Sequence, residues 1–278
     1  MGSSTVTANG LDFRVIEEGR GEPVVLLHGF PDTADVWRNQ VPALADAGFR
    51  VIAPDQRGCG QSDRPDGPEN YGYEALLSDV VGIVDALGIE RFSVIGHDWG
   101  AVLAWAMASF MPDRVDRMAA LSAPHPEELF PIASVEQARM SYYILQFQHP
   151  GVAEQWLRAD NWKNFREAWA GGDTDAQIAD LSEPGKLESR IDWYRANITA
   201  ETMFTPQPEV MLPVSIPVLL VHGERDQFLS EESFLRSEAR CTGPFRYERL
   251  DTGHWMPTEQ PHDVTQLFQE FLGSARRA

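Results

Sequence analysis

The chain has 278 residues, of which 43% are hydrophobic, so it is long enough for one large domain or two modest domains with a full core. Its formal net charge of −19, without a Lys/Arg cluster to neutralise phosphates, argues against binding to nucleic acid or anionic lipid. No run approaches the roughly 20 continuous apolar residues that a membrane-spanning helix needs.

The first part of the chain alternates between strand and helix patterns. Residues 11–17 alternate weakly and predict an edge strand, whereas residues 23–29 and 50–55 are nearly continuous apolar runs, typical of strands buried on both faces. Between and after them, residues 36–45 and 73–87 have the apolar spacing of helices. Such alternation predicts a parallel sheet with helices on both faces.

A strand, a sharp turn and a helix are predicted around Gly-His-Asp-Trp-Gly at positions 96–100. The two glycines suit positions where a side chain would collide with neighbouring backbone. In this frame the residue lifted off the turn is usually Ser, and here it is Asp98. Because a carboxylate is ionised at pH 7 without help, Asp98 is the candidate nucleophile.

The alternation stops after a further strand at residues 115–121 and resumes only at residues 216–223. The interval of roughly 90 residues is rich in aromatic side chains and far exceeds a normal connection. We therefore predict a helical cap at residues 126–212, placed over the carboxyl edge of the sheet, where α/β sheets bind ligands. Residues 1–125 and 213–278 would form the core, which ends with a strand at 245–250 and a helix at 264–272.

Three candidate catalytic side chains follow successive strand patterns. Asp98 comes first, Asp226 lies a few residues past the strand after the cap, and His254 follows the last strand. Since the carboxyl ends of parallel strands meet at one edge, we expect the three to converge beneath the cap, in the order nucleophile, acid, His.

A second motif, His-Gly-Phe-Pro at positions 28–31, follows an earlier buried strand. Loops at that place present a backbone N–H to an oxyanion, and here we expect the N–H groups of Phe30 and Trp99 to do so. His28 and His97 are interpreted as structural. The other histidines share no metal-ligand spacing, so we expect no metal site and no cofactor.

The motifs at 96–100 and 28–31 resemble those of the α/β-hydrolase-fold epoxide hydrolases, and also those of haloalkane dehalogenases. Residues 143–154, which contain Phe-Gln-His-Pro-Gly, and residues 192–197, Asp-Trp-Tyr-Arg-Ala-Asn, resemble the two cap segments of soluble epoxide hydrolases. The match runs from about residue 10 to the C-terminus. It implies an α/β-hydrolase fold: a mostly parallel twisted sheet with an inserted helical cap.

The resemblance also implies a reaction, the conversion of a small uncharged epoxide to a vicinal diol. An ester would form on Asp98 and be hydrolysed by water that His254, oriented by Asp226, activates. The resemblance implies that two cap tyrosines donate to the epoxide oxygen and that aromatic residues line the pocket; these are Tyr143 and Tyr194, then Phe147, Trp99 and Trp255.

Two details and two alternatives stay open. Tyr142 adjoins Tyr143, so either phenol could point inward, and His149 replaces the usual Glu of its motif. A haloalkane dehalogenase would use the same first step, although that family often has Asn where Phe30 stands. A non-catalytic ligand-binding homologue should lack a triad member, and all three candidates are present. Two cysteines and no basic-then-apolar leader lead us to expect a cytoplasmic protein, and its oligomeric state, monomer or homodimer, stays open.

Overall fold

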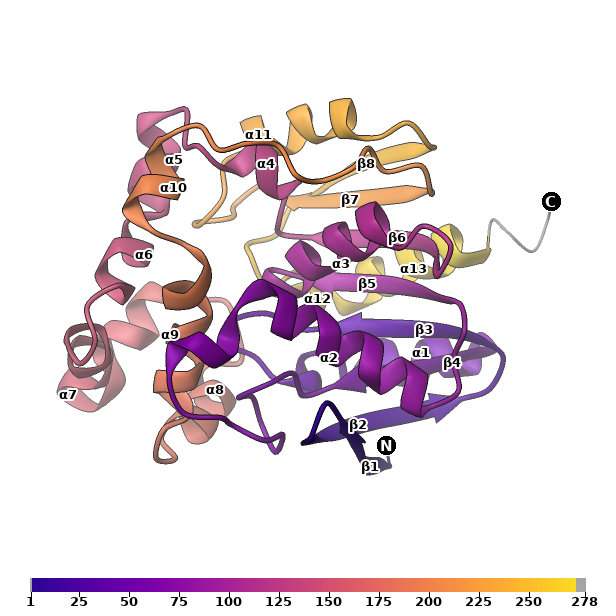
Figure 1. Ribbon diagram of the computed structural model, residues 1–278, viewed down its shortest axis with the longest axis horizontal. Helices are drawn as coiled ribbons and strands as arrows, with labels where there is room; N and C mark the ends of the chain where they lie inside the picture. The colour runs from indigo at the N-terminus through magenta and orange to yellow at the C-terminus, as the bar shows by residue number, and fades with distance from the viewer. Residues whose placement is uncertain (1, 274–278) are drawn as a thin grey trace.

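One continuous sheet runs through the molecule in the computed structural model, which describes residues 2–273 (Figure 1). Its eight strands follow the order β1-β2-β4-β3-β5-β6-β7-β8. The pairs β1–β2 and β2–β4 are antiparallel, and the pairs from β4–β3 onward are parallel. The strands are β1 Ser3–Ala8, β2 Leu11–Gly19, β3 Glu22–Leu27, β4 Phe49–Pro54, β5 Phe92–His97, β6 Val115–Leu121, β7 Val218–Gly223 and β8 Phe245–Leu250.

Helices cover both faces of the sheet, which explains the continuous apolar runs of its strands. In β3, Val24 and Leu26 share a buried cluster with α1 and α13, while Val25 and Leu27 point to the other face, with α2 and α3. The core helices are α1 Gln40–Asp46, α2 Tyr73–Ala86, α3 Trp99–Phe110, α11 Glu231–Arg236, α12 Met256–Glu259 and α13 Pro261–Gly273, with the 3₁₀ turns η1 Ala34–Trp37, η2 Pro68–Tyr71 and η3 Ser237–Arg240. Among residues 2–273, no helix has the length and apolar character that crossing a membrane requires.

The predicted edge strand at residues 11–17 is a strand but not the edge, because β1 pairs along it. Asn9 and Gly10 make the connecting turn, both with positive φ (53° and 79°), so that Ala8 pairs with Leu11. Asn-Gly is the strongest short hairpin signal, since both central residues tolerate that backbone region. The small polar residues of β1 give no strand pattern in the sequence. The Asn-Gly dipeptide is the signal that predicts a hairpin here, and hence a strand before it.

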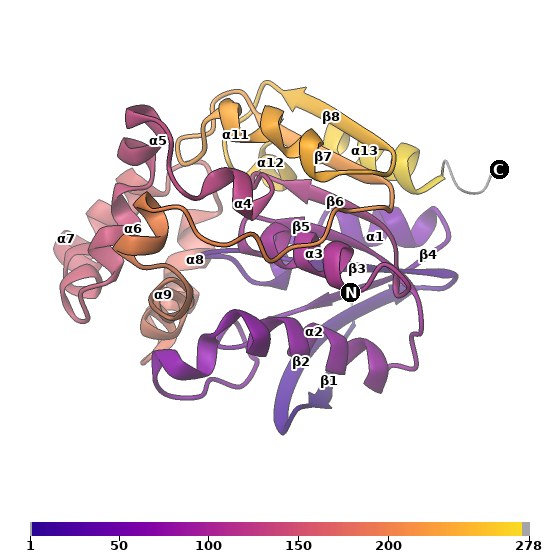
Figure 2. The ribbon, with the colours of Figure 1, turned by 45° about the horizontal axis from the view of Figure 1, so that its top comes forward.

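A helical insert separates β6 from β7. Apart from its first helix, which lies beside the sheet, its helices gather at one end of the molecule in both ribbon views, coloured magenta to orange (Figures 1 and 2). α7 is interrupted by non-helical backbone at residues 159–162, so it is two helices joined at a kink. The insert contains α4 Pro126–Leu129, α5 Val135–Met140, α6 Tyr142–Phe147, α7 Val152–Ala168, α8 Thr174–Leu181, α9 Lys186–Asn197 and α10 Ala200–Phe204.

Candidate active site

The turn between β5 and α3 lifts Asp98 out of the sheet. Asp98 has φ 54° and ψ −120°, a strained conformation for a residue with a side chain. The turn can be this tight because a Cβ at Gly96 would overlap the carbonyl of Gly100, and one at Gly100 would overlap that of Leu27. The Gly-x-x-x-Gly frame therefore fixes where the Asp98 carboxylate stands.

Two backbone N–H groups hold one side of this carboxylate. The N–H of Phe30 donates to Oδ1 of Asp98 at 2.7 Å. The backbone N–H of Trp99 also helps to lower the pKa of this carboxyl group. Burial by itself would raise the pKa of Asp98, but the hydrogen bond and charge of His254, with the backbone N–H of Trp99, hold that pKa below its usual value. Asp98 is thus a largely buried carboxylate kept in its ionised form.

His254 lies between two carboxylates. Its Nδ1 is 2.8 Å from Oδ2 of Asp226, and its Nε2 is 3.7 Å from Oδ2 of Asp98. The other oxygen of Asp226 accepts the backbone N–H groups of Phe228 at 2.8 Å and Leu229 at 3.2 Å, which leaves Oδ2 to His254. The three candidates from three strand ends therefore lie in one chain of contacts.

The charge on His254 depends on those carboxylates. Burial favours the neutral ring, but the charge and hydrogen bond of Asp226, followed by those of Asp98, raise the pKa of His254 to about 10. The loop that carries the ring is fixed from behind. Nε2 of His97 lies 2.9 Å from the carbonyl oxygen of His254, and the Ser122 hydroxyl donates to the same oxygen at 2.7 Å. His97 is fully buried, in keeping with a structural position.

Two phenols from the insert face the nucleophile. Tyr143 on α6 and Tyr194 on α9 pack edge to face with ring centroids 5.7 Å apart, and both line the cavity that contains Asp98. Burial and the negative charge of Asp98 raise the pKa of each phenol above its ordinary value, so both stay protonated at neutral pH. Tyr142 is 66% exposed and points away, which leaves Tyr143 as the inward phenol.

Arg195 links the helices that carry these two tyrosines. It lies on α9 directly after Tyr194, and its Nε donates to the carbonyl of Phe147, at the end of α6, at 2.8 Å. Its Nη2 pairs with Glu154 of α7 at 2.8 Å. The Arg195 guanidinium therefore joins α9 to α6 by a hydrogen bond and to α7 by a buried ion pair, and it helps to set the spacing of α6 and α9. His149 lies nearby at an exposed position and does not line the cavity.

The cavity over Asp98 has a volume of about 220 Å³, below the usual ~300–1,000 Å³ of drug-sized pockets. Trp99 lines it, as expected, but Phe147 and Trp255 do not. The prediction for these two residues is wrong, because Phe147 packs behind the two tyrosines and Trp255 packs behind His254. The wall is mainly apolar; it comprises Tyr73, Asp98, Trp99, Val102, Ala123, Pro124, Pro126, Leu129, Phe130, Ser141, Tyr143, Ile144, Tyr194, Asn197, Ile198, Phe228 and Leu229.

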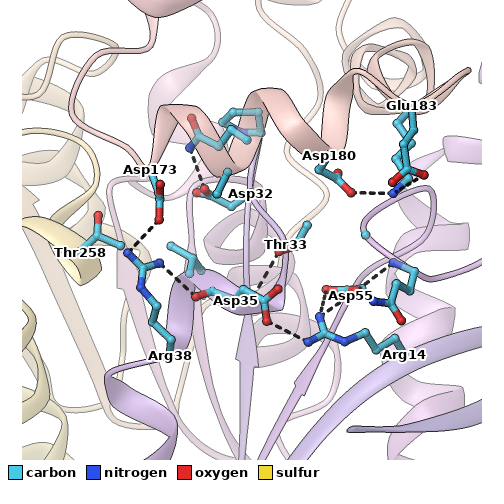
Figure 3. A pocket seen from close by; sticks show the side chains of 17 residues that line it. Arg14, Asp32, Thr33, Asp35, Arg38, Asp55, Asp173, Asp180, Glu183 and Thr258 are labelled. Carbon is cyan, nitrogen blue, oxygen red and sulfur yellow. Dashed lines mark hydrogen bonds and ion pairs between the residues drawn. The ribbon is translucent and has the colours of Figure 1, made fainter. Parts of the chain in front are cut away.

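A second hollow, between the insert and the core, is polar (Figure 3). Its basic groups face acidic ones, as in the ion pairs of Arg14 with Asp35 and of Arg38 with Asp173. Asp98 and the other triad candidates do not line it. It reaches Asp32, a carboxyl that sequence analysis missed although it directly follows His-Gly-Phe-Pro. Burial raises the pKa of Asp32 to about 6, with the charge of Asp98 adding to the effect of burial.

Fold and site together define an α/β-hydrolase with a carboxylate at the elbow and a helical insert that bears two phenols. A family model described as alpha/beta hydrolase fold matches residues 22–261. The chain belongs to that family and, by its relatives, to the epoxide hydrolase-like group within it. The fold predicted from the sequence is confirmed.

The similarity to known proteins extends over nearly the whole chain. It is 36% identical to epoxide hydrolase A of Mycobacterium tuberculosis over 98% of both chains, and 34% identical to the AB hydrolase superfamily protein YfhM of Bacillus subtilis over 96% of both. Among solved structures, epoxide hydrolase A from Mycobacterium thermoresistibile superimposes with a TM-score of 0.83 at 30% identity over 98% of both chains. An inhibitor complex of the Bacillus megaterium epoxide hydrolase gives 0.86 at 26% identity, covering 97% of this chain and 100% of that one.

Proposed function

We propose that this protein is an epoxide hydrolase that converts a small, uncharged epoxide to a vicinal diol through an ester on Asp98. The observation that carries the proposal is the opposition of two protonated phenols, Tyr143 and Tyr194, to an ionised carboxylate across one apolar cavity. An epoxide needs that pair of functions, a nucleophile for the ring carbon and a proton donor for the ring oxygen.

In the first step, Oδ2 of Asp98 attacks a ring carbon and forms the ester bond. The carbon–oxygen bond of the ring breaks, its electron pair goes to the oxygen, and that oxygen takes a proton from the phenols. The raised pKa values of both tyrosines suit this role, because a phenol that stays protonated at pH 7 can donate to a developing alkoxide. The apolar wall keeps competing water away from the nucleophile.

In the second step, water loses a proton to Nε2 of His254 and attacks the carbonyl carbon of the Asp98 ester. The negative charge that develops on Oδ1 is held by the N–H of Phe30, already 2.7 Å from that atom, together with the N–H of Trp99. Collapse of this intermediate breaks the ester bond, releases the diol and restores the carboxylate.

The two steps are linked by charge. While Asp98 is ionised, it helps to hold His254 in the protonated form. Ester formation removes that negative charge, so the pKa of His254 falls and the ring becomes available as a base. The proton that His254 loses balances the one that the ring oxygen gains, so the phenol that donated it is again protonated before the second step. Asp226 keeps the ring oriented throughout, through the 2.8 Å contact to Nδ1.

The cavity also favours a particular substrate. Its polar side chains away from Asp98 already have partners: the Tyr73 hydroxyl donates to Val102 O at 2.9 Å, the Ser141 hydroxyl accepts from Gln137 at 2.8 Å, and Asn197 bonds the backbone of Tyr71 and Tyr73. The rest of the substrate should therefore be apolar and small. The wall draws on the core and on residues 126–212, which we propose form a cap distinct from the core of residues 1–125 and 213–278.

A parallel assay of styrene oxide and a bromoalkane tests the function. We expect diol from the epoxide, without added cofactor, and no bromide above the uncatalysed background. Release of bromide without diol would assign the protein to the dehalogenases instead. If neither diol nor bromide forms, the result would favour a ligand-binding role.

A further inference from the structure

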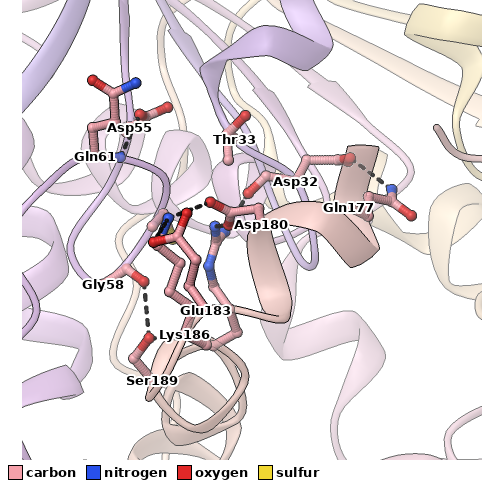
Figure 4. Close-up of polar contacts among 12 residues, drawn as sticks. Asp32, Thr33, Asp55, Gly58, Gln61, Gln177, Asp180, Glu183, Lys186 and Ser189 are labelled. Atoms are coloured by element: carbon pink, nitrogen blue, oxygen red, sulfur yellow. Dashed lines mark hydrogen bonds and ion pairs between the residues drawn. The ribbon is translucent and has the colours of Figure 1, made fainter. Parts of the chain in front are cut away.

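Helix α9, which carries Tyr194, is anchored to the core along its whole length. Its Ser189 hydroxyl donates to Gly58 O at 2.8 Å, and the Trp193 indole donates to Arg57 O at 3.2 Å. Both acceptors lie in the loop after β4, so these bonds hold one side of the helix. Figure 4 shows Ser189 directed at Gly58.

Arg190 makes the contact on the other side of α9. Its Nη1 donates to the backbone carbonyl of Asp32, in the loop that also carries Phe30, and its Nη2 pairs with Asp180 of α8 at 2.6 Å. Asp180 in turn accepts from Lys186 at 2.7 Å, in the group drawn beside Asp32 in Figure 4. One guanidinium thus links two insert helices to the loop whose Phe30 N–H donates to Asp98.

Burying the charge of Arg190 costs free energy of hydration, which suggests that this residue does more than stabilise the fold. The residue is 2% exposed, and a buried charge must recover its lost hydration from its partners. Burial would raise the pKa of Asp180, but the charge of Arg190, with the hydrogen bond and charge of Lys186, lowers it, so the pair is ionised. An apolar side chain would fill the same space without desolvating a charge. What it would not supply is a directed bond to the carbonyl of Asp32.

That bond matters because of where Arg190 lies on its helix. It precedes Tyr194 by four residues, so both side chains project from the same face of α9, about one turn apart. The loop at the other end of the bond is held independently: the Asp32 carboxylate accepts from Gln177 at 2.8 Å and from the Trp255 indole at 3.1 Å. Loss of the guanidinium would therefore release this side of α9 rather than the loop, and the helix could turn about the contacts of Ser189 and Trp193.

We propose that Arg190 is a positioning residue for epoxide opening, which fixes the rotation of α9 so that the Tyr194 hydroxyl points at the oxygen of a ring attacked by Asp98. This inference rests on the proposed function. It assigns to Arg190 an effect on the first step, transmitted through Tyr194. The second step depends on His254 and Phe30, whose contacts to Asp226 and Asp98 do not involve α9.

A double-mutant cycle with styrene oxide tests this assignment. Single-turnover rates of epoxide consumption and of diol release are measured for wild type, Arg190→Lys, Tyr194→Phe and the double variant. Lys keeps the charge beside Asp180 but cannot reach both acceptors. We expect Arg190→Lys to slow opening about tenfold, because small misplacements of a catalytic group are expensive. Ester hydrolysis should change far less.

The cycle separates positioning from loss of stability. In the Tyr194→Phe background, Arg190→Lys should slow opening by less than about threefold more, since coupled residues are not additive. Arg158→Gln is the matched control: Arg158 pairs with Glu188 of the same helix at 2.7 Å, but within the insert, and should leave the opening rate unchanged. Equal slowing in both backgrounds, or no more slowing than in the control, overturns the proposal.

Asp180→Asn covers the case in which Arg190→Lys does not fold, because it keeps an acceptor for the guanidinium while removing the charge. Asp180→Asn should also slow epoxide opening less in the Tyr194→Phe background than in wild type. Equal slowing in both backgrounds would again overturn the assignment. If wild type does not consume the epoxide, or Tyr194→Phe opens it at the wild-type rate, the proposed function itself fails and this inference fails with it.

Discussion

The backbone N–H of Phe30 donates to Oδ1 of Asp98 at 2.7 Å, while Oδ2 of the same carboxylate lies 3.7 Å from Nε2 of His254. The two oxygens of Asp98 are therefore not equivalent. Oδ1 already accepts a backbone N–H, as an oxyanion at that atom would, and Oδ2 is the oxygen paired with His254. In the proposed mechanism, this asymmetry favours attack by Oδ2 and retention of charge on Oδ1.

Replacing His254 by Gln should trap the ester. The amide cannot accept a proton from water, so we expect the second step to slow by at least about 100-fold while the first continues. Intact-protein mass spectrometry after mixing with styrene oxide should show one added substrate mass. A variant that turns over at the wild-type rate and shows no adduct would remove His254 from its assigned role.

The two cap tyrosines should act on the first step. Tyr143→Phe and Tyr194→Phe each remove a proton donor and are expected to slow epoxide opening by about 10- to 100-fold, because the remaining phenol still donates. Rapid-quench measurement of epoxide consumption checks this. Tyr142→Phe is the control, since Tyr142 adjoins Tyr143 in sequence but is 66% exposed, and it should leave the rate unchanged. Slowing in the control but not in Tyr143→Phe would reverse the assignment of the inward phenol.

The charge of Asp98 should control the titration of His254. In Asp98→Asn one of the two carboxylates beside the ring is neutral, so the pKa of His254 should fall below its value of about 10. NMR titration of the His254 ring measures this shift directly. Glu167→Gln, which removes a surface charge that is 69% exposed, should not change the titration. An unchanged pKa in Asp98→Asn would contradict the proposed link between ester formation and base activation.

The same raised pKa makes a prediction about stability. Because the folded state holds the His254 proton more tightly than the unfolded chain does, the interaction stabilises fully below about pH 6.5 and is lost as the pH rises towards 10. Between pH 7 and pH 10, wild type should therefore lose more free energy of unfolding than Asp98→Asn. Denaturant unfolding across that range, with equal losses in both proteins, would argue against a charged resting His254.

Much of the site was predictable because its residues follow strands. Asp98 comes directly after a strand, Asp226 and His254 lie a few residues past theirs, and the strand order puts those ends at one edge of the sheet. The two phenols lie on helices whose sequences resemble a known cap. Resemblance supplied their positions, since helical periodicity does not say which of two adjacent tyrosines faces inward.

The parts that sequence did not predict depend on contacts between distant segments. Asp32 is surrounded by Gln177 and Trp255, which lie 145 and 223 residues away in the chain. Phe147 and Trp255 were placed in the pocket wall, but Tyr143, Tyr194 and His254 stand in front of them. The role inferred for Arg190 likewise depends on a backbone carbonyl, an acceptor that every residue offers and no motif marks.

The fate of oxygen from water tests the ester on Asp98 most directly. With enzyme in excess over styrene oxide in ¹⁸O-water, a single turnover should give a diol without label, because its new oxygen comes from Asp98. The peptide that contains Asp98 should carry the label, because water attacks the ester carbonyl. A labelled diol together with an unlabelled Asp98 peptide would show that water opens the epoxide directly and would contradict the account.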